Sequence, residues 1–143
     1  MFDRILIPTD GSQPARRAAE TGVDLAREHD ATVQALYVID PVYAEEAGSQ
    51  KVSDALQRKA ERTVGELAEL AESAGLAAET EVRTGTAYDE IIDASEDLDS
   101  DVIVMGTHGR TGLGRYLLGS VTQKVVRLSD VPVLTVRTGP DQD

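Results

Sequence analysis

The sequence predicts an α/β fold: a single open sheet of five parallel strands with helices on both faces. Short apolar runs, typical of buried strands, alternate with longer segments whose apolar residues recur at helical spacing. This alternation continues to the fifth strand and indicates parallel strands joined by right-handed crossovers in a three-layer sandwich. At 143 residues the chain has the length of one domain. We expect that domain to cover residues 1–138 and residues 139–143 to form a loose tail.

The first strand and the first helix follow from the opening segment. The apolar run Ile5–Ile7 predicts a strand that ends at Pro8. Ser12 is placed to cap a helix, and Pro14 suits its first turn. Small residues on one side of this helix permit close docking on the sheet: Ala15, Ala18, Ala19, Gly22, Val23 and Ala26.

The middle of the chain supplies two strands and the longest helix. Thr32–Ile39 predicts the second strand. Apolar residues at helical spacing predict a helix over about 49–73, which Gly75 closes. Leu76–Thr84 mostly alternates between apolar and polar residues, so this third strand is expected at an edge of the sheet or half exposed.

The last third of the chain completes the alternation. Thr86 and Asp89 are spaced as a capping box for a helix that runs to about Leu98. Val102–Met105 is a continuous apolar run, as expected of a strand buried on both faces. Val131–Val136 predicts the fifth strand.

The glycine-rich segment after the fourth strand is the best candidate for a binding site. Gly106 and Gly109 follow the strand directly, and glycine lets backbone N–H groups approach an anion closely. Gly119 and Ser120 open the last helix, whose unpaired N–H donors and positive dipole end, with the Ser120 hydroxyl, suit a phosphate group. The apolar residues at helical spacing around that helix are Leu118, Val121, Val125 and Leu128.

Two common phosphate loops are excluded by this spacing. No GK[ST] follows the glycines, so the lysine of a Walker loop is absent. The stretch GRTGLG has its glycines in the wrong order for the dinucleotide fingerprint, and it follows the fourth strand rather than the first.

A second segment is expected at the same edge of the sheet. Pro8, Thr9 and Asp10 come just past the first strand, and ligands of such sheets bind beyond the carboxyl ends of the strands, where the winding direction reverses. If the first and fourth strands are neighbours, Asp10 faces the glycine-rich segment. Its carboxylate can accept hydrogen bonds from ribose hydroxyls or help hold a divalent cation. Val38, at the end of the second strand, would give a base an apolar wall, so the layout is that of a nucleotide cleft.

Three of these residues also have a structural interpretation. Asp10 precedes Gly11 and Ser12, an arrangement typical of a turn. Ser12 is expected to serve as an N-cap alone. Val38 is equally suited to the core.

The polar and aromatic residues of the loops are less specific. His108 is placed to touch a phosphate, although a lone loop histidine is usually solvated. Arg110 and Arg115 can neutralise phosphate charge or form surface ion pairs. Tyr43 and Tyr88 can flank a base, but a surface position is commoner for such residues.

Composition excludes several classes of function. The net charge of −12 argues against nucleic acid as a primary partner, because duplex binding needs basic groups. The chain has eleven arginines but three lysines. An acidic, lysine-poor surface keeps a protein soluble when salt screens its charges, so we expect a high-salt cytoplasm; the alternative is an ordinary acidic protein.

The composition also limits the cellular location and the redox chemistry of the protein. The absence of cysteine excludes disulfides and thiolate sites. No apolar run approaches the roughly 20 residues needed to span a bilayer, and the N-terminus has no signal-peptide core. We therefore expect a cytoplasmic protein with no membrane partner.

Four residues of the glycine-rich segment form a longer pattern: Gly106, two residues, Gly109, nine residues, Gly119 and Ser120. This pattern resembles the ATP-binding signature of the universal stress protein family. The opening ILIPTDGS, the YVID at Tyr37–Asp40, the MGTHGRTG stretch and the closing VPVLTV also match that family, in order and over nearly the full chain. The resemblance implies a Rossmann-like sandwich of the adenine-nucleotide alpha-hydrolase type and a homodimer with contacts through the last strand.

The resemblance also implies an ATP site. The positions that would surround adenine and ribose are Pro8, Thr9, Asp10 and Val38. Those that would surround ribose and phosphates are Met105, Gly106, Gly109, Gly119, Ser120 and Val121. We add His108 and Arg110 as candidate phosphate contacts and Asp10 as a candidate ligand of Mg²⁺ or Mn²⁺.

The favoured function is an ATP-binding stress-response or regulatory module in which nucleotide occupancy biases a conformation or the dimer state. No catalyst can be identified, because the spacing gives no paired carboxylates, no nucleophile–base pair and no Walker lysine. The alternatives are a slow Mg- or Mn-dependent ATPase and a nucleotide-free, chaperone-like scaffold. The intact glycine and serine positions weigh against the scaffold.

The dimer has physical support of its own. Val131, Val133 and Val136 lie in a short apolar strand at the end of the chain, and the unpaired N–H and C=O groups of a sheet edge invite a partner. The alternative is an edge blunted by Pro132 and the acidic tail.

Overall fold

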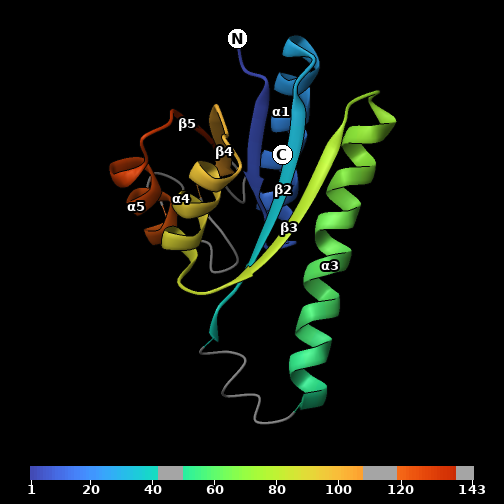
Figure 1. The fold of residues 1–143 in the computed structure, drawn as a ribbon, viewed down its shortest axis with the longest axis vertical. Coiled ribbons are helices and arrows are strands. Elements are labelled where there is room, and N and C mark those ends of the chain that lie inside the picture. Colours follow the sequence, from blue (N-terminus) through green and yellow to red (C-terminus); the bar gives the residue numbers. More distant parts are fainter. Residues whose placement is uncertain (42–49, 108–118, 138–143) are drawn as a thin grey trace.

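The computed structural model describes residues 1–41, 50–107 and 119–137. Five strands form one parallel sheet in the order β3-β2-β1-β4-β5 (Figure 1). The predicted fold class is confirmed. The strands are β1 (Arg4–Pro8), β2 (Thr32–Ile39), β3 (Ala78–Thr84), β4 (Val102–Gly106) and β5 (Val133–Val136), and the helices are α1 (Gln13–His29), α3 (Gln50–Ser73), α4 (Ala87–Asp97) and α5 (Ser120–Leu128).

The winding direction of the sheet reverses between β1 and β4. These two strands pair in parallel, with Ile5 opposite Val102 and Leu6 opposite Ile103. On one side of this pair the chain proceeds to β2 and β3, and on the other side to β5. The first and fourth strands are therefore neighbours, as a cleft at their carboxyl ends requires.

Two apolar cores fill the space between the sheet and its helices. Successive side chains of a strand point to opposite faces, so Ile5 and Ile7 contribute to one core and Leu6 to the other. Helices α1 and α3 cover the first face, and α4 and α5 cover the second (Figure 1). Because both faces are covered, every residue of Val102–Met105 is buried, as predicted. Within the described part of the chain, no helix is long and apolar enough to cross a membrane.

Helix α1 follows its prediction closely. The Ser12 hydroxyl accepts a hydrogen bond from the Ala15 N–H group (3.3 Å), so Ser12 is the N-cap. The helix ends at Asp30, which takes the left-handed conformation (φ 54°). All six of the predicted small residues face the core and are buried: Ala15, Ala18, Ala19, Gly22, Val23 and Ala26.

Strand β3 lies at an edge of the sheet, as its alternating sequence predicts. It begins at Ala78 rather than at Leu76, because the Leu76 N–H group donates to the Ala71 carbonyl (3.0 Å) and still belongs to the turn after α3. Thr86 is the N-cap of α4, but its side chain makes no capping hydrogen bond. The predicted capping box is wrong in this respect, and the acidic side chains of Asp89 and Glu90 complement the helix dipole instead.

The last strand is shorter than its apolar residues suggest, and one apolar residue of the last helix is exposed. The Val131 N–H group donates to the Ser129 hydroxyl (3.1 Å), so Val131 lies in a turn and β5 begins at Val133. Val121 and Val125 pack into the core as predicted. Leu128 does not: it is the last residue of α5, and its side chain is 54% exposed.

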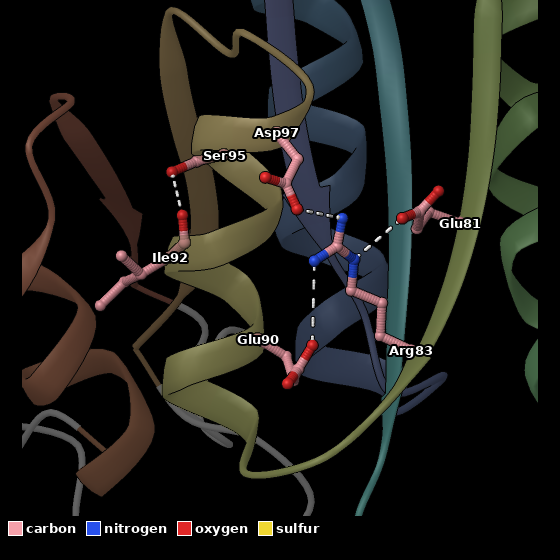
Figure 2. Close-up of polar contacts among 6 residues, drawn as sticks. All are labelled: Glu81, Arg83, Glu90, Ile92, Ser95 and Asp97. Atoms are coloured by element: carbon pink, nitrogen blue, oxygen red, sulfur yellow. Dashed lines mark hydrogen bonds and ion pairs between the residues drawn. The ribbon is translucent and has the colours of Figure 1, made fainter.

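Arg83 connects the edge strand β3 to helix α4 (Figure 2). Its guanidinium lies 2.8 Å from the Glu81 carboxylate, 3.0 Å from Asp97 and 3.8 Å from Glu90. Partial burial acts to lower the pKa of Arg83, but the hydrogen bonds that its guanidinium donates to Asp97 and Glu81 outweigh this effect and raise that pKa above its ordinary value. One arginine thus gathers three carboxylates of a strongly acidic chain.

The Asp101 carboxylate ties the start of β1 to the start of β4, and it predicts a pH dependence of stability. It accepts hydrogen bonds from the Asp3 N–H group (2.7 Å) and the Arg4 N–H group (2.9 Å), which lower the pKa of Asp101 below its ordinary 3.8. The stabilisation is therefore present above pH 3.8 and is lost as the pH falls through the depressed value in the folded protein.

We expect Asp101→Ala to lower the free energy of unfolding by about 1 kcal/mol at pH 7, discounting the charged hydrogen bonds for solvent exposure. The difference from wild type should shrink toward zero below the ordinary pKa. Urea unfolding between pH 2.5 and pH 7, in steps of about half a unit, measures it. Asp93→Ala, which removes an exposed carboxylate of α4, is the control, and a difference that stays constant with pH would refute the assignment.

Candidate functional site

The carboxyl ends of β1, β2 and β4 lie at one edge of the sheet, together with the start of α5. Strand pairing places Pro8 beside Leu36, so Val38 continues two residues past the end of β1. On the other side of β1, β4 ends at Gly106. The sequence-predicted residues of this edge therefore come from elements that are adjacent in the sheet.

The loop between β1 and α1 is held by its own side chains. The Thr9 N–H group donates to the Leu36 carbonyl (2.8 Å), which extends the contact with β2. The Gly11 N–H group donates to the Thr9 hydroxyl (3.2 Å), and the Ser12 N–H group donates to the Asp10 carboxylate (2.9 Å). Asp10 is thus a turn residue, as the structural interpretation held, and the turn fixes its carboxylate at this edge of the sheet.

The floor of the site is apolar on the side of α4 and α5. Val38, Met105 and Val121 all belong to the core on this face; Met105 is buried, and the other two are partly buried against it. Pro8 shares the strand face of Leu6, two residues earlier, which lies in the same core. The core interpretation of Val38 is therefore right in part, because the side chain also keeps some exposure at the edge.

The start of α5 is fixed to the end of β4 by two hydrogen bonds. The Gly119 N–H group donates to the Thr107 carbonyl (2.5 Å), and the Thr122 hydroxyl donates to the Gly106 carbonyl (2.8 Å). Thr122 is buried, and it is not among the site residues predicted from the sequence. Its only signal was a threonine in the first turn of a helix, a position from which a hydroxyl can bond to nearby backbone.

Charge distinguishes the N-termini of the helices at this edge. Helix α4 carries Asp89 and Glu90 in its first turn, whereas α5 has no acidic residue there. Helix α1 also lacks acidic residues in its first turn, but the Ser12 hydroxyl caps it. The N-cap of α5 is Gly119, which has no side chain to accept a hydrogen bond. Of these three, α5 therefore offers an anion the least neutralised helix terminus.

Ser120 is the first residue of α5, and it is exposed. It lies directly after the glycine that is bonded to the end of β4. His108, Gly109 and Arg110 lie outside the described residues, as do Arg115 and Tyr43.

A metal site made by the protein alone is absent from the described part of the chain: no group of three or more histidine, aspartate or glutamate side chains there could hold an ion. Asp10 is the one carboxylate predicted for this role. A divalent cation bound there would take its other ligands from phosphate oxygens or water, as Mg²⁺ commonly does.

The whole described chain matches a known family. The family model described as "Universal stress protein family" matches residues 1–137. The chain belongs to the universal stress protein family. The sequence resemblance is therefore confirmed over nearly the whole chain.

Individual relatives support the same assignment. Universal stress protein MJ0531 of Methanocaldococcus jannaschii is 37% identical over 141 residues, which cover 96% of this chain and 83% of that protein. The solved structure of MJ0577, from the same organism, is 31% identical with a TM-score of 0.85, and the match covers 96% of this chain and 97% of that one. The universal stress protein from Archaeoglobus fulgidus in complex with dAMP shares the fold, with a TM-score of 0.71, 20% identity, and coverage of 94% and 97%.

Proposed function

We propose that this universal stress protein binds an adenine nucleotide, ATP in particular, at the carboxyl edge between β1 and β4. The observation that carries the proposal is the start of α5: an uncapped helix terminus without acidic residues, bonded to the end of β4 at the point where the winding reverses. A relative with this fold has been solved with dAMP, which supports an adenine nucleotide as the ligand.

Each predicted residue has a role in this proposal. Around adenine and ribose, Val38 and Pro8 supply apolar contacts, while Thr9 and the Asp10 carboxylate supply polar groups. Around the phosphates, backbone N–H groups and the Ser120 hydroxyl are the donors. The remaining residues of the proposed contact set are Met105, Gly106, His108, Gly109, Arg110, Gly119 and Val121.

The bound nucleotide serves a stress-response or regulatory switch rather than a reaction. A ligand shifts a protein between two states by as much as its affinities for them differ. The exposed edge of β5 is the proposed contact of a homodimer, and it supplies an equilibrium that occupancy can bias. Slow hydrolysis with Mg²⁺ or Mn²⁺ at Asp10 is the enzyme alternative.

Calorimetric titration with ATP and Mg²⁺, followed by analysis of the recovered nucleotide, tests the proposal. We expect saturable heat and intact ATP. Steady release of ADP that is lost in Asp10→Ala but kept in Asp24→Ala, an exposed aspartate of α1, would identify the ATPase instead. The absence of heat would refute nucleotide binding and favour the scaffold.

A further inference from the structure

Helices α4 and α5 meet through a lysine and a tyrosine. The Lys124 ammonium lies over the ring of Tyr88, 4.8 Å from its centroid. This distance is within the range of a cation–π interaction, in which the negative face of the ring attracts the cation. Tyr88 is partly buried and packs on the core under α4 and α5, so the ring is a fixed platform for a mobile side chain.

The ring holds the Lys124 charge without neutralising it. The chain has 26 acidic residues and only three lysines, yet Lys124 makes no ion pair with any carboxylate of the described residues. Arg83, on the edge strand β3, is by contrast within 4.0 Å of three carboxylates. The Lys124 ammonium therefore keeps a positive charge that can act on a ligand.

The position of this charge relates it to the proposed phosphate site. Lys124 follows Ser120 by four residues, so the two lie on the same side of α5. Long side chains of a helix lean toward its N-terminus, which carries Lys124 toward the turn that begins with Ser120. Tyr88 is in the first turn of α4 and packs on the same core as Val121, which places the pair near the starts of both helices.

We infer that Lys124 is a specificity-determining residue that favours nucleotides with more than one phosphate group. This inference rests on the proposed function. One phosphate is satisfied by the amides and hydroxyl at the start of α5, whereas each further phosphate adds negative charge that calls for a cation. Tyr88 is a positioning residue, since it acts by holding the ammonium beside the site.

Titration of AMP and ATP into the wild-type protein and into Lys124→Met tests this inference. We expect Lys124→Met to lower the affinity for ATP about tenfold and the affinity for AMP less than about twofold, so that the preference for ATP falls. Lys124→Arg should keep the preference. Lys59→Met, which removes a positive charge from α3, is the matched control and should leave both affinities unchanged.

The tyrosine provides a separate readout. Tyr88→Phe keeps the ring and should keep the preference for ATP, whereas Tyr88→Leu removes the ring and should lower it. The double variant, Tyr88→Leu with Lys124→Met, should lose no more of the preference for ATP than Lys124→Met alone, because the two residues act as a unit. Thermal unfolding of each variant separates these effects from loss of the fold.

Two outcomes would overturn the inference and can be told apart. In the first, wild type binds ATP, but Lys124→Met weakens the binding of AMP and ATP equally or leaves both unchanged. Lys124 then does not recognise the additional phosphates, and the proposed function stands. If wild type binds neither nucleotide, the proposed function fails and the inference fails with it.

Discussion

Ser120→Asp is expected to weaken ATP binding by about tenfold while leaving the fold intact. The substitution places a carboxylate in the first turn of α5, which has no acidic residue in the native chain. Repulsion between unit charges about 4 Å apart ranges from about 1 kcal/mol in water to about 4 kcal/mol near a protein surface. The side chain at position 120 is exposed, so the smaller part of this range applies, and tenfold corresponds to about 1.4 kcal/mol.

The same substitution should act on stability in the opposite direction. An aspartate in the first turn of a helix interacts favourably with the helix dipole and contributes about 0.3 to 1 kcal/mol. We therefore expect an unchanged or slightly raised melting temperature together with the loss of affinity. Calorimetric titration and thermal unfolding of the same preparation measure the two effects.

Ser120→Asn is the matched control, because asparagine has nearly the shape of aspartate without its charge. It should bind ATP within about threefold of wild type, since its side-chain amide can still donate a hydrogen bond to a phosphate. If Ser120→Asn loses as much affinity as Ser120→Asp, the effect is one of shape or of the lost hydroxyl. If neither variant loses affinity, the phosphates do not bind at the start of α5.

Much of this fold can be predicted from the sequence because its strands are buried on both sides. The bounds of β2 agree with the prediction at both ends, since a run of apolar residues between turn residues has few other interpretations. The edge that carries the candidate site was predicted from a general rule of parallel sheets, which requires β1 and β4 to be neighbours, and these strands do pair.

The details that were missed depend on contacts between residues distant in sequence. Thr122 bonds to the carbonyl of Gly106, and the ring of Tyr88 meets Lys124 on another helix; no local pattern encodes either pair. The prediction that Leu128 packs into the core was wrong for a related reason. Helical spacing identifies the face that a residue occupies, but burial also requires that the neighbouring element extend as far as that residue.

Gly22→Val is expected to lower the free energy of unfolding by about 1 to 3 kcal/mol, because it overfills the contact between α1 and the sheet. A Cβ at Gly22 would lie 2.6 Å from Ile7 Cδ1, 3.1 Å from Ile7 Cγ1 and 3.4 Å from Val104 Cγ1. Ile7 and Val104 are both fully buried, so neither can turn toward solvent to make room. Urea unfolding followed by circular dichroism measures the change.

Gly65→Val is the control for helix propensity. Gly65 lies within α3, and a Cβ there would meet no atom within 4 Å. Valine is a better helix former than glycine, so this variant should be neutral or slightly more stable than wild type. Equal destabilisation by the two substitutions would show that the contact with Ile7 is not the cause.

A second substitution isolates the contact itself. Ile7→Val removes Cδ1, the atom nearest to the new side chain. In the wild-type protein this change should cost about 0.5 to 1.5 kcal/mol, because it leaves a small cavity. In the Gly22→Val protein the same change should restore part of the stability, since it removes the nearest overlapping atom, and such non-additivity is the signature of two residues in direct contact. Ile7 directly precedes Pro8 and the loop that holds Asp10, so Gly22→Val should also weaken ATP binding, and the rescued protein should recover part of that affinity.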